Sequence, residues 1–289
     1  MKISSLFGQG KTVFSFEIFP PKKTSSIETI YNTLEELKDL KPAFISVTYG
    51  AGGTLTEAGH SKTCEIASII KNKYNVTPVA HLTCVNSTKA QVEAELNALK
   101  ANGIENILAL RGDINPDIPL CSDFKHASDL VEFIKERGDF HISGACYPEG
   151  HADAESKEQD ILNLKKKTDA GVTHLMSQLF FDNQHFYDFL ENARNAGVSV
   201  PVEAGIMPVT NKSQIERMVT MCGASLPQKF VKAMQRFENN PEALRDAGIA
   251  YAIDQIVDLI SNGVDGIHLY TMNNPYVARK ISEAIGSLL

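Results

Sequence analysis

The stretch TVFSFEIF, residues 12–19, is the first of eight short runs that decide the fold. It is rich in aromatic and β-branched residues, which is typical of a strand, and it stops at Pro20 and Pro21. Amphipathic segments with helical spacing, such as SSIETIYNTLEELKDL (25–40), separate the runs and make the chain an alternation of predicted strands and helices. The seven further runs are AFISVTYG (43–50), TPVAHLTC (77–84), ENILALRGD (105–113), FHISGACYP (140–148), THLMSQLFFD (173–182), VPVEAGIMP (200–208) and DGIHLYTMN (265–273).

The fold class follows from the character of these runs. They are nearly continuous in apolar residues, which favours strands covered on both faces, as in parallel sheets. Eight strands alternating with helices over 289 residues predict an α/β fold of the (β/α)8 TIM-barrel type. The rival is a doubly wound open sheet, which the same alternation also builds. The long interval between the seventh and eighth runs predicts two or three extra helices, and we expect one catalytic domain over residues 1–289.

Composition narrows the class of function. The formal net charge of -7 argues against binding to nucleic acid or to an anionic membrane surface. The five cysteines are odd in number and show no Cys-x-x-Cys spacing, which argues against a disulfide framework or a zinc site and for a reducing cytoplasm. We see neither a signal peptide nor an apolar run long enough to span a bilayer.

Polar side chains stand at the end of nearly every predicted strand. Taken singly, each is compatible with packing or turn chemistry. In a barrel, however, the carboxyl ends of all the strands meet at one face, and a ring of buried polar groups there needs a ligand or water to satisfy it. These residues are Glu17, Thr48, Tyr49, His81, Thr83, Arg111, Gly112, Asp113, Tyr147, Glu149, His151, Gln178, Asp182, Tyr270, Thr271 and Asn273.

A glycine-rich sequence, GAGG (50–53), follows the second predicted strand. It does not match the G-x-G-x-x-G dinucleotide fingerprint. Its three glycines permit unusual dihedral angles and a close approach to the backbone, which suits a flat ligand and a tight turn equally.

The helix expected after the fifth strand carries a second polar group. Ser156, followed three residues later by Gln159, predicts a capping box at its start. Asp160, Asn163 and Lys167 then share one helical face, with Lys166 farther round. A solvated face explains this pattern, and so does a surface that binds phosphate, ribose or another polyol.

Metal and covalent chemistry are not indicated. His81, His151 and His174 are scattered, without the spacing of a zinc site, and no Ser or Cys stands in a nucleophile elbow. The candidate chemistry is therefore acid–base catalysis with a bound organic cofactor and no metal.

Eight motifs in order carry a resemblance over essentially the whole chain. They read FSFEIFPPK, SVTYGAGG, HLTC, LALRGD, YPEGH, QLFFD, GIMP and HLYTMN. Together they resemble the methylenetetrahydrofolate reductase family, close to its short bacterial single-domain form. The resemblance implies a (β/α)8 barrel that carries FAD and reduces 5,10-methylenetetrahydrofolate to 5-methyltetrahydrofolate. It implies a ping-pong route in which NADH or NADPH reduces the flavin, leaves, and is replaced by the folate.

The resemblance also implies roles for individual residues. Glu17 matches the general acid that protonates N10 of the folate and opens its five-membered ring to an N5 iminium. Its apolar neighbours, such as Phe16 and Ile18, favour the protonated form of its carboxyl. Asp113 matches a catalytic aspartate near flavin and pterin, and Gln178 and Gln214 match substrate-contacting residues. The positions that match flavin contacts are Thr48, Tyr49, Ala51, His81, Arg111, Gly112, Asp113, Tyr147, His151, Asp160, Asn163, Lys166 and Lys167.

This chain departs from the family pattern after YTMN. Many relatives have an arginine there that contacts substrate or nucleotide, whereas this chain has Asn274 followed by Pro275. Lys166 is often arginine in relatives, so a cation is retained without the bidentate geometry. The departure at Asn274 bears on how the folate tail binds and on which molecule donates electrons.

Two other functions remain open at this point. A flavin-free pterin methyltransferase or pterin-binding module shares barrel and folate but has no use for the face of Asp160, Asn163 and Lys167. A flavoprotein subunit fed by an iron–sulfur partner is the other, and the partner must bring the cluster because this chain lacks a cluster-binding cysteine pattern. Relatives of this length are often homo-oligomers, and we expect the same here.

Overall fold

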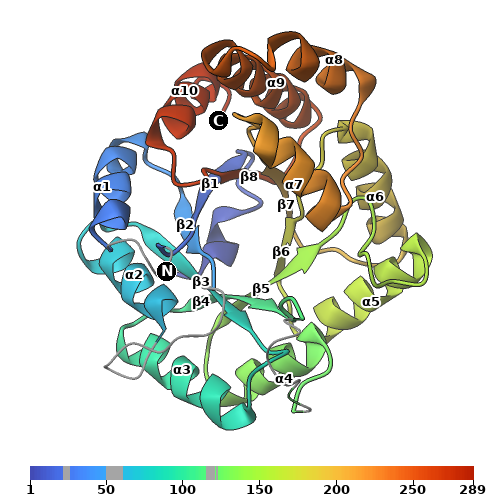
Figure 1. The fold of residues 1–289 in the computed structure, drawn as a ribbon. Coiled ribbons are helices and arrows are strands. Elements are labelled where there is room, and N and C mark those ends of the chain that lie inside the picture. Colours follow the sequence, from blue (N-terminus) through green and yellow to red (C-terminus); the bar gives the residue numbers. More distant parts are fainter. Residues whose placement is uncertain (22–26, 50–60, 115–120, 122) are drawn as a thin grey trace.

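Parallel strands close into a barrel in the computed structural model, and helices surround it (Figure 1). The structure describes residues 1–21, 27–49, 61–114, 121 and 123–289. Ala51 and the glycines of GAGG lie outside the described residues. The strands are β1 (Val13–Ile18), β2 (Phe44–Val47), β3 (Thr77–Thr83), β4 (Asn106–Leu110), β5 (His141–Cys146), β6 (His174–Ser177), β7 (Val202–Ile206) and β8 (Gly266–Tyr270).

Closure of the sheet confirms the barrel and excludes the open doubly wound arrangement. Each strand pairs in parallel with the next along the chain, and β8 returns to pair with β1. In that last pairing Ser15 stands opposite His268 and Glu17 opposite Tyr270. The eight runs read from the sequence all contain strands of the barrel.

Helices alternate with the strands as predicted. The helical segments are η1 (Ile3–Leu6), α1 (Glu28–Leu37), η2 (Lys38–Leu40), α2 (Lys62–Asn72), α3 (Lys89–Ala101), α4 (Ala127–Arg137), α5 (Lys157–Ala170), α6 (Asn183–Asn195), α7 (Lys212–Cys222), α8 (Gln228–Phe237), α9 (Pro241–Ser261) and α10 (Pro275–Ile285). The expected extra helices between the last two strands are α7, α8 and α9. No helix in the described ranges is long and apolar enough to cross a bilayer.

Strand alternation sorts the side chains of β1 between two environments. Phe14, Phe16 and Ile18 join the apolar cluster between strands and helices. Residues 13, 15 and 17 therefore point into the barrel, where Val13 packs in a second apolar cluster. This alternation explains how a carboxylate can stand within an apolar run, because Glu17 faces the barrel interior while its neighbours face the helices.

Local signals in the sequence set where the helices begin and end. Ser156 starts α5 by accepting a hydrogen bond from the Gln159 backbone N–H at 3.1 Å, as predicted. The other half of the expected capping box is not formed, because the Gln159 side chain donates to Asn163 instead. Gly103 follows α3 with a φ of 67°, a left-handed geometry that favours glycine.

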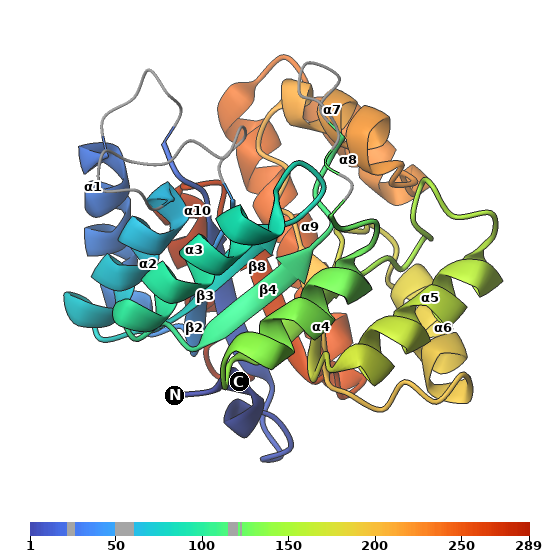
Figure 2. The ribbon, with the colours of Figure 1, turned by 90° about the horizontal axis from the view of Figure 1, so that it is seen from below.

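The two ends of the barrel differ. The segment around η1 lies beneath the end where the strands start (Figure 2), and its Ile3 and Phe7 pack against Val13 and Phe44. The carboxyl ends of the strands lie at the opposite end, beside α7 and α8 in Figure 2. The apolar closure of one end leaves the other end for the site.

Candidate active site

A cavity of about 1000 Å³ occupies the carboxyl end of the barrel. It lies at the upper limit of the roughly 300–1,000 Å³ that small-molecule sites span. It draws residues from β1, from β3 to β6, from β8 and from the segment just after β2, so strands far apart in the sequence converge on it. The predicted site residues that line it are Glu17, Thr48, Tyr49, His81, Arg111, Gly112, Asp113, Tyr147, His151 and Gln178.

Glu17 lies low in the cavity, with 17% of its side chain exposed. Its Oε2 atom is 3.5 Å from Nε2 of His81 and 3.6 Å from Nε2 of His268. Both distances exceed those of a normal hydrogen bond. The carboxyl therefore has histidine neighbours on two sides and still reaches the space where a ligand would lie.

His81 is a neutral neighbour. It is 6% exposed, and burial lowers the pKa of its imidazole to about 4, against the opposing effect of the Glu17 charge. Its Nε2 atom is buried and has no hydrogen-bond partner among the described residues. A buried polar atom of this kind fits a site that a ligand completes.

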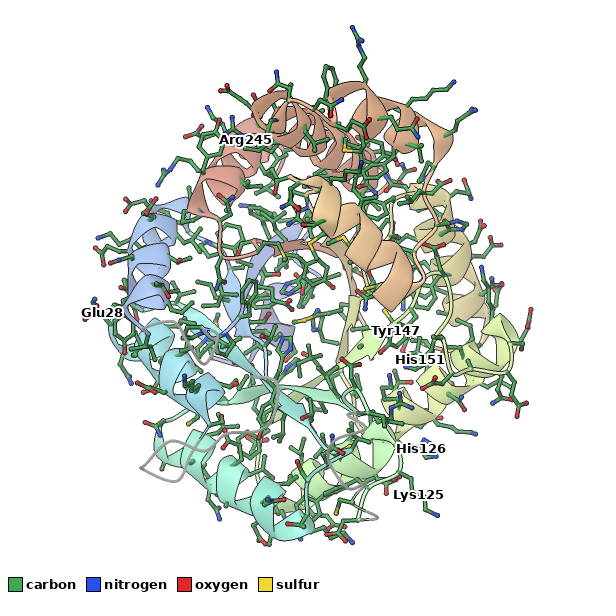
Figure 3. The ribbon with its side chains drawn as sticks, viewed as in Figure 1. Glu28, Lys125, His126, Tyr147, His151 and Arg245 are labelled. Atoms are coloured by element: carbon green, nitrogen blue, oxygen red, sulfur yellow. The ribbon has the colours of Figure 1, made fainter. Side chains whose placement is uncertain are left out.

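Two tyrosines bring desolvated hydroxyls to the cavity wall. Burial raises the pKa of Tyr49 and of Tyr147 to about 12, so both stay protonated at neutral pH. Tyr147 lies beside His151 after β5, as Figure 3 shows, with ring centroids 4.6 Å apart in an edge-on arrangement. Together they supply aromatic surface next to polar edges.

A cation stands at the end of β4. The Arg111 guanidinium donates to Asp153 Oδ2 at 2.7 Å, in a partly exposed ion pair. Next to it, Gly112 has a φ of 86°, and a Cβ there would come within 3.0 Å of Thr83. This position therefore needs glycine for the turn that places Arg111 and Asp113 at the cavity.

Comparison with known proteins places nearly the whole chain in one family. The family model described as methylenetetrahydrofolate reductase matches residues 2–286. The chain belongs to the methylenetetrahydrofolate reductase family. Membership makes it an oxidoreductase of folate metabolism, on the barrel that the sequence predicts.

Curated relatives include bacterial and plant proteins. The 5,10-methylenetetrahydrofolate reductase of Escherichia coli (strain K12) is 35% identical over 278 residues, which cover 96% of this chain and 92% of that protein. "Methylenetetrahydrofolate reductase (NADH) 1" of Arabidopsis thaliana is 36% identical over 94% of this chain. This chain spans about half of that plant protein's length, 48%.

A solved structure shares the fold. It is described as an uncharacterized protein from Clostridium thermocellum that binds two copies of 5-methyl-5,6,7,8-tetrahydrofolic acid. The TM-score is 0.65 with 96% of each chain covered, and the sequence identity is 14%. At that identity the likeness concerns the fold.

The polar face expected on α5 is not part of the cavity lining. Asp160 accepts a hydrogen bond from the His151 backbone N–H at 3.1 Å, and so holds the loop after β5. Burial raises the pKa of this carboxyl. The Lys167 ammonium points inward and donates to the Ala145 carbonyl at 2.7 Å, and burial lowers its pKa. These two side chains hold the backbone of β5 and of the loop after it, which carry residues of the cavity lining.

The remaining polar residues of that face are exposed. Lys166 donates to Asn163 at 3.5 Å on the outer surface of α5. Gln214 also lies outside the cavity lining, since its Oε1 accepts from the Thr210 and Asn211 backbone N–H groups at the start of α7. In this structure Gln214 caps the start of α7, whereas the family resemblance implies that it contacts the substrate.

Asn274, where the family pattern often has arginine, caps α10. Its Oδ1 accepts from the Val277 backbone N–H at 3.3 Å, and Pro275 takes the first helical position. The neighbouring Asn273 bonds both the N–H and the carbonyl of Phe19, so β1 and β8 are tied together at their carboxyl ends.

Sequence reasoning missed several side chains that line the cavity, and among them His268 lies beside Glu17. His268 lines it, two residues before Tyr270, which lines it as well. Inward-facing residues of a strand recur every second position, so Tyr270 at the strand end carried the signal for His268. The hydroxyl of Tyr270 donates to the Ser177 carbonyl at 2.7 Å, and burial raises its pKa.

Proposed function

We propose that this protein reduces 5,10-methylenetetrahydrofolate to 5-methyltetrahydrofolate with FAD as cofactor and NADH or NADPH as electron donor. The observation that supports this most directly is the placement of Glu17. A carboxyl group lines a large cavity of mixed polar and apolar character, beside a neutral histidine. The names of the bacterial relatives agree with this activity, and the name of the plant relative agrees with NADH.

The residues present fit a flavin. Nε2 of His81 is buried, has no hydrogen-bond partner in the part of the chain that the structure describes, and belongs to the cavity lining, where a polar ring edge would satisfy it. Arg111 supplies a cation for phosphate, while Tyr49 and Tyr147 supply aromatic surface with protonated hydroxyls. When bound, FAD supplies hydride chemistry that links the pyridine nucleotide to the folate.

Glu17 would move the proton that the folate needs. Methylenetetrahydrofolate accepts a hydride poorly while its N5 and N10 are bridged. A proton from the Glu17 carboxyl to N10 breaks the C–N10 bond and leaves an N5 iminium, which accepts a hydride readily. General acids of this kind contribute roughly 10²–10⁴-fold to a rate.

Asp113 and Gln178 would position the substrate. Asp113 is an exposed residue at the cavity, and a carboxylate there can accept hydrogen bonds from the amino and ring N–H groups of a pterin. The side-chain oxygen of Gln178 accepts from the Leu179 backbone N–H at 2.9 Å. That hydrogen bond fixes the orientation of the amide, so its NH2 group points away from Leu179.

An anaerobic visible spectrum tests this function. We expect a flavin band that bleaches with NADH or NADPH and returns when methylenetetrahydrofolate is added. A flavin band that ignores both nucleotides would favour a protein electron donor. If no flavin band appears even after FAD is added, the reductase function is wrong and the flavin-free pterin-binding barrel is favoured.

A further inference from the structure

A fully buried carboxylate lies inside the barrel, and the proposed chemistry does not use it. Glu203 on β7 has 0% exposure. Gly266 on β8 stands opposite it in register, and a Cβ at Gly266 would come within 2.6 Å of the Glu203 side chain. Burying a carboxylate costs several kcal/mol unless it is paired, on the order given for isolated ions in proteins. The absence of a side chain at Gly266 therefore leaves space for the Glu203 side chain, although burying its carboxylate costs free energy.

Glu203 has a polar neighbour at each carboxylate oxygen. The Ser15 hydroxyl donates to Oε1 at 2.9 Å, and Nε2 of His174 lies 3.1 Å from Oε2. On its other side, His174 places Nδ1 3.0 Å from the Ser143 hydroxyl. The ring of His141 lies 6.1 Å from that of His174, and burial, with smaller effects of His174 and Lys2, lowers its pKa to about 3. His141 is therefore neutral at physiological pH.

Ser15 connects Glu203 to His268. Its oxygen lies 2.6 Å from Nδ1 of His268, on the neighbouring strand. A serine hydroxyl has a single hydrogen to donate, and an ionised carboxylate can only accept. When Ser15 donates to ionised Glu203, its oxygen must accept from His268, which puts the proton of a neutral imidazole on Nδ1.

This tautomer leaves a lone pair on Nε2 of His268. That atom faces the Ser46 hydroxyl at 3.2 Å and Oε2 of Glu17 at 3.6 Å. The nearer Ser46 hydroxyl can donate to this lone pair, while the Glu17 carboxyl at 3.6 Å is too far for a hydrogen bond and feels the lone pair electrostatically. A lone pair facing the carboxyl favours its acid form. The opposite tautomer would place an N–H there, which would favour the carboxylate. The proton state of Glu17 thus depends on the tautomer of His268.

Two titratable groups that flank this series of buried side chains are neutral at physiological pH. His81, on the far side of Glu17, has its pKa lowered to about 4. Tyr270, whose ring lies 5.6 Å from that of His268, has its pKa raised by burial and donates to Ser177. Neither adds a charge that would override the effect of Glu203.

We propose that Glu203 is a positioning residue for the acid Glu17. Through the Ser15 hydroxyl it holds His268 as the Nδ1–H tautomer, and His268 presents its Nε2 lone pair to the Glu17 carboxyl. The role of Glu17 as acid rests on the proposed function. The tautomer of His268 does not, and it is measured separately.

Nitrogen-15 NMR of the flavin-loaded, histidine-labelled protein at pH 7.5 tests the tautomer. The His268 signals are assigned by their loss in His268→Asn. In the wild type we expect a protonated Nδ1 and a bare Nε2. In Glu203→Gln and in Ser15→Ala we expect proton density to move to Nε2. Ser15→Ala leaves the buried carboxylate in place, so it tests the link even if Glu203→Gln folds poorly.

Ser143→Ala is the matched control. It removes a hydroxyl of the same buried chain, on the side of His174 away from His268, and should leave the His268 tautomer unchanged. A wild-type His268 protonated on Nε2, or a tautomer unchanged in both Glu203→Gln and Ser15→Ala, would overturn the proposal.

Stopped-flow kinetics of the two half-reactions tests the consequence for Glu17. In Glu203→Gln we expect flavin reduction by NADH within twofold of wild type. Folate reduction should fall about tenfold at pH 7.5 and recover at lower pH, as a one-unit downward shift of the acid limb produces. A loss that is equal in both half-reactions and independent of pH would indicate a structural role only, and would overturn the proposal. Absence of folate reduction in the wild type would contradict the proposed function and leave the NMR result standing.

Discussion

Oε2 of Glu17 lies 3.5 Å from Nε2 of His81, and the histidine is neutral at physiological pH because burial lowers its pKa to about 4. The contact is therefore not a salt bridge at pH 7. His81 therefore presents no positive charge to the Glu17 carboxyl. This arrangement suits an acid better than a charged binding group.

Glu17→Gln should separate the two half-reactions. The amide keeps the shape of the side chain but cannot donate a proton to N10. We expect flavin binding and reduction by the nucleotide to remain, and folate reduction to fall by about 10²–10⁴-fold. Stopped-flow absorbance at the flavin band measures both rates. Glu238→Gln, a surface carboxylate paired with Lys212, is the control. Turnover of the folate near the wild-type rate would show that Glu17 is not the acid.

Stability should fall in mild acid because of buried histidines. Burial lowers the pKa of His141 to about 3, and neither ring nitrogen has a hydrogen-bond partner among the described residues. In the unfolded chain His141 binds a proton below its ordinary pKa of 6.5. In the folded protein it binds that proton only below about pH 3. The stabilising contribution is thus present above pH 6.5 and lost as the pH falls. From pH 7 to pH 5 we expect a loss of about 2 kcal/mol from this residue.

His141→Leu should remove that part of the pH dependence. Leucine fills the space without burying two unpaired nitrogens, so the free energy of unfolding should change less between pH 7 and pH 5. Urea unfolding at both pH values measures it. His126→Asn, at an exposed helix N-cap where asparagine is favoured, should leave the pH dependence as in wild type. An identical slope in His141→Leu and wild type would contradict the argument.

The sequence was sufficient for the barrel and for most of the polar residues that line the cavity, for a geometric reason. Strand periodicity and the order of eight runs determine which end of the barrel collects the polar residues, so Glu17, Arg111 and Tyr147 could be placed together. The expectations for Lys167 and Gln214 did not foresee where these side chains go. Lys167 turns inward to a carbonyl of β5 and Gln214 folds back on its own helix start, and both choices depend on local contacts that spacing does not encode.

The series of buried side chains that links Glu17 to Glu203 could not be predicted from the sequence, for a different reason. Ser15, His174, Glu203 and His268 sit on four strands spread over most of the sequence. Each alone reads as an ordinary inward-facing residue of a barrel strand. Only the closed barrel, with β8 beside both β1 and β7, makes them neighbours.

Gln214 offers a test between its capping role and the role implied by the family. Its side-chain oxygen accepts from Thr210 and Asn211 at the start of α7, so Gln214→Ala should lower the free energy of unfolding by about 1 kcal/mol. Gln214→Glu keeps the acceptor and should keep the stability. If Gln214 also contacts the folate, Gln214→Glu should raise KM at unchanged stability. A stable Gln214→Ala with a normal KM would contradict both roles.

The close approach of α9 to the end of β7 depends on Gly248. A Cβ at this position would lie 1.6 Å from the Val209 carbonyl oxygen, so alanine fits only if helix and loop separate. Overpacking typically costs about 1–3 kcal/mol, and a shift of backbone costs more. We expect Gly248→Ala to lose at least 3 kcal/mol, a value at the upper end of that range. Gly263→Ala, just after the same helix, has a φ of 75° and open space around its Cβ, and should lose about 1–2 kcal/mol. Urea unfolding measures the loss of unfolding free energy in both variants. Equal losses would mean that the close packing of α9 against Val209 does not contribute to stability.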